Sequence, residues 1–203
     1  MNFAVGIFDL FTYTIPGSLY LGFFSYLGFR LHWVDPAAAA RLPTVLLIAI
    51  LVLASYLLGY MAYPVGALLN KVIPQRRDRR VRPEFLRRVP AAKDREFVKV
   101  DPGLLLSAIQ LQDKDLGAEV SRLRAGGLML RNSAPALLLG TITAVVEIFT
   151  SARPGMAGAL AGALAAGSVA LLVHGRRLSL WAGLKTLELA YWLPDVDERS
   201  RPQ

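Results

Sequence analysis

The longest stretch without a charged residue, residues 42–70, is the feature that most restricts what this chain can fold into. A charge at the centre of a bilayer is costly, whereas about 20 consecutive apolar residues are enough for a helix to span the hydrocarbon core. Within this stretch, residues 43–69 form an apolar segment that is long enough to cross a bilayer with tilt. The sequence therefore predicts a transmembrane helix here.

Three further segments have the length and composition of membrane spans. Residues 10–29 carry no charge, residues 134–150 carry only Glu147, and residues 156–173 are mostly Ala, Gly and Leu. Residues 151–155, SARPG, form a short turn that suits a helical hairpin between the last two. Hydrophobic residues make up 54% of the chain, above the roughly 45–50% of soluble domains. We expect an all-α integral membrane protein with about four transmembrane helices and a helical cytoplasmic insert.

Two prolines lie inside the first two predicted spans, at Pro16, which is followed by Gly17, and at Pro64. A proline removes one backbone hydrogen bond from a helix and favours a kink. Such kinks act either as hinges or as local packing adjustments.

The charge distribution predicts the organisation of the chain and its orientation. We divide it into a first helix pair (1–69), a basic segment (70–133), a second helix pair (134–173) and an amphipathic tail (174–203). Residues 70–133 hold 15 of the 23 Lys and Arg residues, which places this segment in the cytoplasm by the positive-inside rule. An even number of spans then places both termini in the cytoplasm. The Arg-rich and Ala-rich composition suggests a bacterial inner membrane, and the N-terminus lacks the basic start of a cleaved signal peptide.

The basic segment itself divides into two parts. Residues 70–100 are interrupted by prolines and arginines and are expected to be irregular or to form short helices. Asp101 and Pro102 form an N-cap and a first helical position, and from there apolar residues recur at helical spacing to Leu130. We expect one helix of about 30 residues that continues through Arg131 into the third span. In the tail, the aromatic-rich residues 178–193 either lie on the inner membrane face or cap the helical insert.

The sequence offers no catalytic or metal-binding constellation. It has no cysteine, and its two histidines, His32 and His174, are far apart and predicted on opposite sides of the membrane. The common nucleophile, zinc and phosphate-loop motifs do not occur. We expect a protein that is not an enzyme, with no catalytic residue, no cofactor and no metal.

Glu147 is the single formal charge inside a predicted span, and charged residues in spans usually face a bundle interior or a water-filled path. Helical spacing places Thr143 and Thr150 on nearly the same face, which gives one polar stripe. In an assembly of several copies, this stripe would form a ring of carboxylates that admits cations. Alternatively, Glu147 lies near the outer interface and pairs with Arg153.

The fourth predicted span contains small residues at helix-packing intervals. Gly158 and Gly162 form a GxxxG pair, and Gly167 belongs to a parallel small-residue row. Such rows let helix backbones approach closely in lipid. They pack either against another span of the same chain or against another subunit, and a homo-oligomer is our expectation.

The basic sequence QRRDRRVRPEFLRR at residues 75–88 has two interpretations. Arginines next to a membrane fix its orientation and contact anionic lipid. Guanidinium groups also bind phosphates bidentately, so a nucleotide or an oligonucleotide is the second candidate ligand. The candidate anion-binding residues are Arg76, Arg77, Arg79, Arg80, Arg82, Arg87 and Arg88.

The arrangement of a span pair, a basic insert and a second span pair, with VSRLRAGGLMLRNSAPALLLG at residues 120–140 leading into the third span, resembles the small multi-span membrane effectors of bacterial antiphage defence. The resemblance implies an oligomeric channel or membrane-disrupting effector. Its cytoplasmic part would respond to a nucleotide signal made by a partner nucleotidyltransferase. The alternative is a membrane anchor, scaffold or accessory subunit that docks a cytoplasmic partner through residues 101–131.

Overall fold

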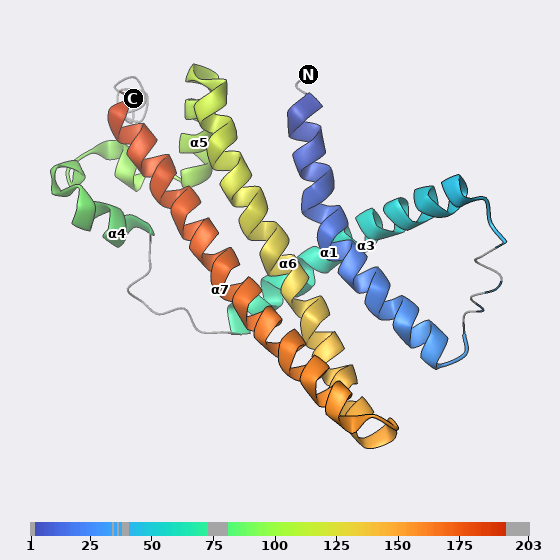
Figure 1. Cartoon of the computed structure of the whole chain (residues 1–203). Coiled ribbons are helices and arrows are strands. Elements are labelled where there is room, and N and C mark those ends of the chain that lie inside the picture. Colours follow the sequence, from blue (N-terminus) through green and yellow to red (C-terminus); the bar gives the residue numbers. More distant parts are fainter. Residues whose placement is uncertain (1–2, 34, 36, 38–40, 73–80, 194–203) are drawn as a thin grey trace. The chain divides into compact units, whose positions relative to one another are not determined.

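The computed structural model describes residues 3–33, 35, 37, 41–72 and 81–193, and within these residues all regular structure is helical, as predicted (Figure 1). The described residues form six α-helices and two short 3-10 segments. They are α1 (Phe3–Arg30), α3 (Thr44–Val72), α4 (Val81–Arg88), α5 (Pro102–Gln112), α6 (Lys114–Thr150) and α7 (Pro154–Trp192), with η2 (Pro90–Ala92) and η3 (Glu96–Lys99) between α4 and α5.

The chain is divided into two compact units. The membrane unit contains Met1–Ile73 and Leu128–Gly175, and the insert unit contains Pro74–Gly127 and Arg176–Gln203. Helices α6 and α7 each contribute to both units, because each continues across the boundary without interruption. The membrane unit thus contains both predicted helix pairs together with residues 70–73, 128–133 and 174–175, and the insert unit contains the rest of the predicted basic segment and tail.

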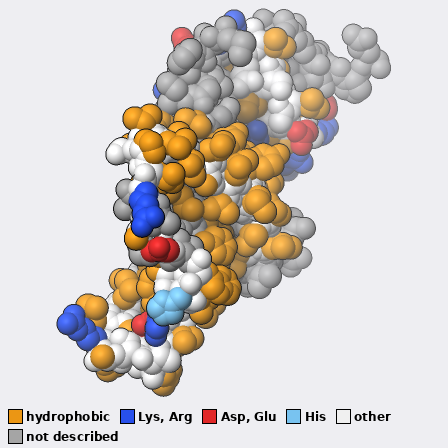
Figure 2. Space-filling view, turned by 90° about the vertical axis from the view of Figure 1, so that its right-hand side faces the viewer, with side chains coloured by type: hydrophobic (Ala, Val, Ile, Leu, Met, Phe, Trp, Pro, Cys, Tyr) orange, Lys and Arg blue, Asp and Glu red, His pale blue; other side chains and the backbone are white. Residues whose placement is uncertain are grey.

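Three described helices are long and apolar enough to cross a membrane: Thr44–Leu69 of α3, all of α6 and all of α7. Their large apolar side chains are widely exposed, and Figure 2 shows such side chains over much of one face. An apolar surface of this extent is what a bilayer covers. Helix α1 contains the predicted first span but is not among these three helices. Its crossing of the bilayer stays a prediction.

Helices α1 and α3 cross with their backbones in direct contact, and the crossing is visible in Figure 1. A Cβ atom added at Gly17 would overlap the Ser55 carbonyl, and one added at Gly59 would overlap the Tyr13 carbonyl. Around this point, the Tyr13 ring packs against Tyr56 at a centroid distance of 6.0 Å. Glycine is required on both helices, because any side chain would hold the two backbones apart.

The prolines do not interrupt the helices that contain them. Pro16 lies within the continuous helix α1, and Pro64 lies within the continuous helix α3. Pro16 is fully buried next to the Gly17 contact. This position favours the packing interpretation of Pro16 over a hinge.

The insert unit has its own hydrophobic core. Phe85 of α4 and Phe97 of η3 are fully buried and meet edge to face at 6.2 Å. Leu184 and Leu187 of α7 complete the same cluster, so the tail caps the insert, as one of the two predicted alternatives had it. If α6 and α7 both cross the bilayer, the two parts of this unit lie on the same side of it.

The prediction of one continuous helix from Asp101 through Arg131 is wrong, because the structure has two helices there, α5 and α6. Asp113 ends α5 in an extended conformation, and its carboxylate accepts hydrogen bonds from the Asp115 and Leu116 amides at 2.9 and 3.2 Å. An aspartate in this conformation caps a new helix more readily than it continues an old one. The predicted cap at the start is confirmed: Asp101 accepts from Gly103 N at 2.7 Å.

We predict that Gly17→Ala separates α1 from α3 and lowers the free energy of unfolding by about 1–3 kcal/mol, the usual cost of overpacking. The matched control is Gly22→Ala on the same helix, where an added Cβ meets no atom within 4 Å. Because alanine favours the helix, the control should be neutral or stabilising. Thermal unfolding in a mild detergent measures the stability of both variants. Equal stability of Gly17→Ala and Gly22→Ala would contradict the backbone contact between α1 and α3.

Candidate functional site

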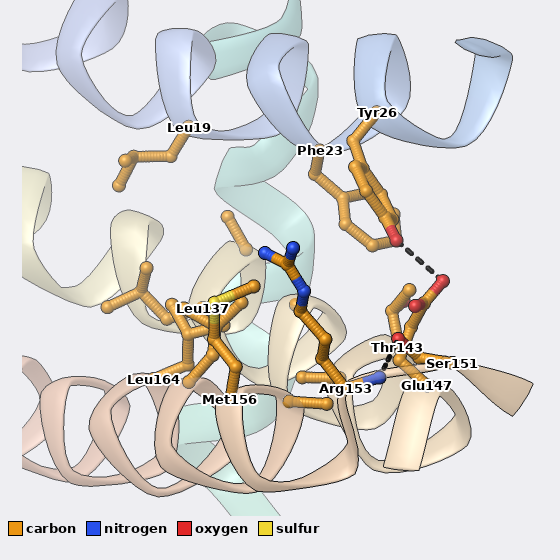
Figure 3. Close-up of a pocket in the computed structure, with 15 residues that line it drawn as sticks. Leu19, Phe23, Tyr26, Leu137, Thr143, Glu147, Ser151, Arg153, Met156 and Leu164 are labelled. Carbon is orange, nitrogen blue, oxygen red and sulfur yellow. Dashed lines mark hydrogen bonds between the residues drawn. The ribbon is translucent and has the colours of Figure 1, made fainter. Parts of the chain in front are cut away.

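In the membrane unit, a cluster of charged and polar side chains lies near the end of α6. Glu147, four residues before the start of the turn at Ser151, accepts two hydrogen bonds on one carboxylate oxygen, Oε1. The Tyr26 hydroxyl donates at 2.7 Å and the Arg30 Nε donates at 3.0 Å. Figure 3 shows Tyr26 reaching from α1 toward this carboxylate. The cluster therefore fastens the end of α1 to the end of α6.

Neither partner of Glu147 was identified from the sequence. The interpretation that paired Glu147 with Arg153 chose the wrong arginine, since the ion pair is made by Arg30. Tyr26 and Arg30 are four residues apart and so share one face of α1. That spacing, at the end of an apolar helix, was the available signal, but nothing in the sequence indicated which helix would lie opposite.

The two threonines of the predicted polar stripe are placed differently. Thr143 lines the same pocket as Glu147, whereas Thr150 is exposed and does not. Each hydroxyl donates to a carbonyl one turn earlier, at 3.1 Å to Leu139 and 3.3 Å to Val146. A pore lined by Glu147, Thr143 and Thr150 stays a prediction.

A pocket of about 420 Å³ lies between α1, α6 and α7 beside this cluster (Figure 3). Its walls are largely apolar, and its polar groups come from residues near the ends of α1 and α6 and the start of α7. The residues that line it are Leu19, Phe23, Tyr26, Ala136, Leu137, Gly140, Thr143, Ala144, Glu147, Ser151, Arg153, Met156, Ala157, Leu160 and Leu164.

Arg153 is the cation among the described residues that line this pocket, since Arg30 binds Glu147 without lining it. Figure 3 shows its side chain reaching from the beginning of the α7 segment into the pocket. Its backbone N–H is held by the Ser151 hydroxyl at 3.2 Å, and its guanidinium group makes no hydrogen bond or ion pair within the described part of the chain. The pocket therefore combines apolar walls with an uncompensated positive charge.

The three glycines predicted to form an oligomer interface have different surroundings. A Cβ at Gly167 would meet Leu137 at 3.2 Å, so this glycine lies against α6 of the same chain. A Cβ at Gly158 would only touch Ile148 at 4.0 Å, and one at Gly162 would meet nothing within 4 Å. The face at Gly162 is therefore open in the single chain.

The predicted anion-binding arginines are only partly within the described residues; Arg76, Arg77, Arg79 and Arg80 lie outside them. Arg82 donates to the carbonyl oxygens of Lys99 and Val100 at 3.2 and 3.1 Å. Arg87 and Arg88 both bind the Glu84 carboxylate, at 2.9 and 3.1 Å. These three arginines thus contribute to the structure of the insert unit, while the Arg87 side chain remains 77% exposed.

Among the described residues, no group of three or more His, Asp or Glu side chains is placed to hold a metal ion. Comparison of the chain with protein-family models, with curated proteins and with solved structures finds no match. The function has to be argued from the residues themselves.

We predict that Tyr26→Phe lowers the melting temperature by a few degrees, because the Glu147 carboxylate loses its shorter hydrogen bond. In a Glu147→Gln background, Tyr26→Phe should lower the melting temperature clearly less, and a double-mutant cycle measures this difference. Tyr60→Phe is the matched control, since its exposed hydroxyl makes no described hydrogen bond. Additive effects of Tyr26→Phe and Glu147→Gln would contradict the coupling.

The folding stability of the insert unit should depend on pH because of Glu84. Hydrogen bonds from Arg87 and Arg88 lower the pKa of Glu84 below its ordinary value of 4.5. A lowered pKa in the folded state contributes stability above the unfolded-state value, and this contribution is lost as the pH falls through the folded-state pKa. The stability difference between the wild type and Glu84→Gln should be present at pH 7 and shrink below about pH 4.5. A difference that stays constant from pH 7 to pH 3 would contradict this assignment.

Proposed function

We propose that this multi-span membrane protein is a self-associating channel or membrane-disrupting effector that is held closed by the Arg30–Glu147 pair. The observation that carries the proposal is the open small-residue face of α7. A Cβ atom added at Gly162 would meet no atom of another element within 4 Å, and Ala159, Ala163 and Ala166 around it are exposed. Because lipid offers no hydrophobic contrast, such a face stabilises helix association through close backbone packing.

The surroundings of Glu147 support a closed state in the single chain. Arg30 and Tyr26 occupy one oxygen of the only carboxylate among residues 134–150. A carboxylate that is already neutralised attracts a cation weakly. Conduction through an assembly would require Glu147 to regain its negative charge, which the displacement of Arg30 achieves even if Tyr26 stays bound.

The insert unit supplies the sensing function in this proposal. The 70–133 segment has 15 basic and 8 acidic residues, a net charge of +7 out of +8 for the chain. Such an excess favours a polyanionic ligand, and we propose a nucleotide or oligonucleotide, made by a partner nucleotidyltransferase in bacterial antiphage defence. The proposed role is non-enzymatic, with the insert unit and both termini on the cytoplasmic side of the inner membrane.

Self-association is tested first, in nanodiscs, by the mass of the assembly. We expect Gly162→Leu to reduce the fraction of oligomer several-fold, because the leucine blocks the close approach of α7 to a second copy. Gly22→Leu is the matched control, since Gly22 also has open space around it but lies on α1. A monomeric wild type, or an equal effect of both variants, would argue against the α7 interface.

Conductance in planar bilayers tests the gate. Arg30→Gln should raise the cation current, because it uncovers Glu147, and the additional change Glu147→Gln should abolish that increase. Oligonucleotides and cyclic nucleotides added on the cytoplasmic side should raise the wild-type current. The channel would be contradicted if the folded, oligomeric wild type and Arg30→Gln both showed no current with any of these ligands.

A membrane anchor or scaffold is the second candidate, and one observation favours it. On α5, Leu104 and Leu111 are seven residues apart, share one helix face and are 66% and 82% exposed. An apolar pair of this kind suits docking of a cytoplasmic partner. Substitution of both leucines by serine should abolish recovery of a partner by cross-linking in cells without changing the conductance.

A further inference from the structure

We propose that the pocket between α1, α6 and α7 binds an anionic phospholipid, with one acyl chain along the apolar walls and the phosphate at Arg153. This inference does not require the proposed channel, because it concerns a binding site of the single chain; the two proposals share the Arg30–Glu147 pair. It rests on the pocket, on the pairing of Glu147 and on the position of Arg153.

The walls of the pocket match an acyl chain. Phe23 of α1, Leu137 of α6 and Leu164 of α7 supply apolar surface from three different helices (Figure 3). The volume of about 420 Å³ lies within the range of roughly 300–1,000 Å³ found for small-molecule sites. Met156 and Leu160, which also line the pocket, are 66% and 54% exposed. The pocket is therefore continuous with the outer surface of the helices, and a lipid can enter sideways from the bilayer.

The charges at the polar end select an anion. Glu147 is paired with Arg30 at 3.0 Å, whereas the guanidinium of Arg153 has no acidic partner among the described residues. One carboxylate and two guanidinium groups leave a net charge of +1. Had Glu147 paired with Arg153 instead, the guanidinium inside the pocket would already have been neutralised. A guanidinium group binds a phosphate through two parallel hydrogen bonds, which gives both charge and geometric complementarity.

The combination identifies the class of ligand. A free phosphate would gain nothing from the apolar walls, and an uncharged hydrocarbon would leave Arg153 without a partner. Arg153 lies in the short connection between the ends of α6 and α7, where the polypeptide leaves the apolar helices. This is the level at which a phospholipid places its phosphate.

The test uses the full chain in nanodiscs of phosphatidylcholine that contain a trace of phosphatidylglycerol with a photoactivatable group on one acyl chain. We expect labelled peptides from residues 136–144 and 156–164, and at least tenfold less labelling in Arg153→Gln. Arg41→Gln, at an exposed arginine outside the pocket, is the matched control and should label like the wild type. In the wild type, photoactivatable phosphatidylcholine should label these peptides only weakly. The expected extent is about that of phosphatidylglycerol labelling in Arg153→Gln.

A second variant keeps the proposal falsifiable if Arg153→Gln alters the fold. Leu160→Trp should fill the pocket and reduce labelling, whereas Val169→Trp, at an exposed site on the same helix, should not. Unlabelled phosphatidylglycerol should compete, while inorganic phosphate and palmitate should not. Three outcomes would each overturn the proposal. The first is labelling of α3 as strong as that of α6 and α7, and the second is equal labelling of Arg153→Gln and Arg41→Gln. The third is competition by palmitate alone or by phosphate alone.

Discussion

The close approach of helix backbones is the constraint on which the membrane unit depends. Large apolar side chains gain little from one another in lipid, so association relies on contacts that side chains would prevent. Gly17 and Gly59 allow α1 and α3 to touch, and Gly66 allows α3 to lie against Asn132 of α6. Helix α3 thus contacts both α1 and α6. The Tyr26–Glu147 and Arg30–Glu147 hydrogen bonds then join α1 and α6 directly.

The choice between two arginines determines the chemistry of the pocket. Arg30 and Arg153 both lie near the ends of apolar helices, and either could neutralise Glu147 as judged from the sequence. In the structure Arg30 pairs with the carboxylate, and Arg153 remains uncompensated beside apolar walls. The same pair therefore keeps Glu147 from acting as an open cation site and leaves the pocket suited to an anion. Both proposals depend on this one contact.

In the insert unit, basic residues have structural as well as electrostatic tasks. Arg82 satisfies two backbone carbonyls at the end of η3, and Glu84 gathers Arg87 and Arg88 on one side of α4. The buried Phe85 lies on the same short helix. Helix α4 has only eight residues, too few to be stable alone, so the packing of Phe85 against Phe97 and α7 holds it in place. Anion binding by this segment has to be compatible with these contacts.

The sequence by itself determined the helical class, the apolar helices and the cap at Asp101, because these depend on composition and on interactions between residues close in the chain. The break at Asp113 is also local, but the apolar periodicity that continues across it concealed it. Only the tertiary structure decided that the tail joins the insert in one core, that Arg30 rather than Arg153 binds Glu147, and that Gly162 is open whereas Gly167 is packed. Those outcomes depend on which helix faces come together, and in lipid that is set by backbone fit between distant segments, which periodicity and charge do not encode.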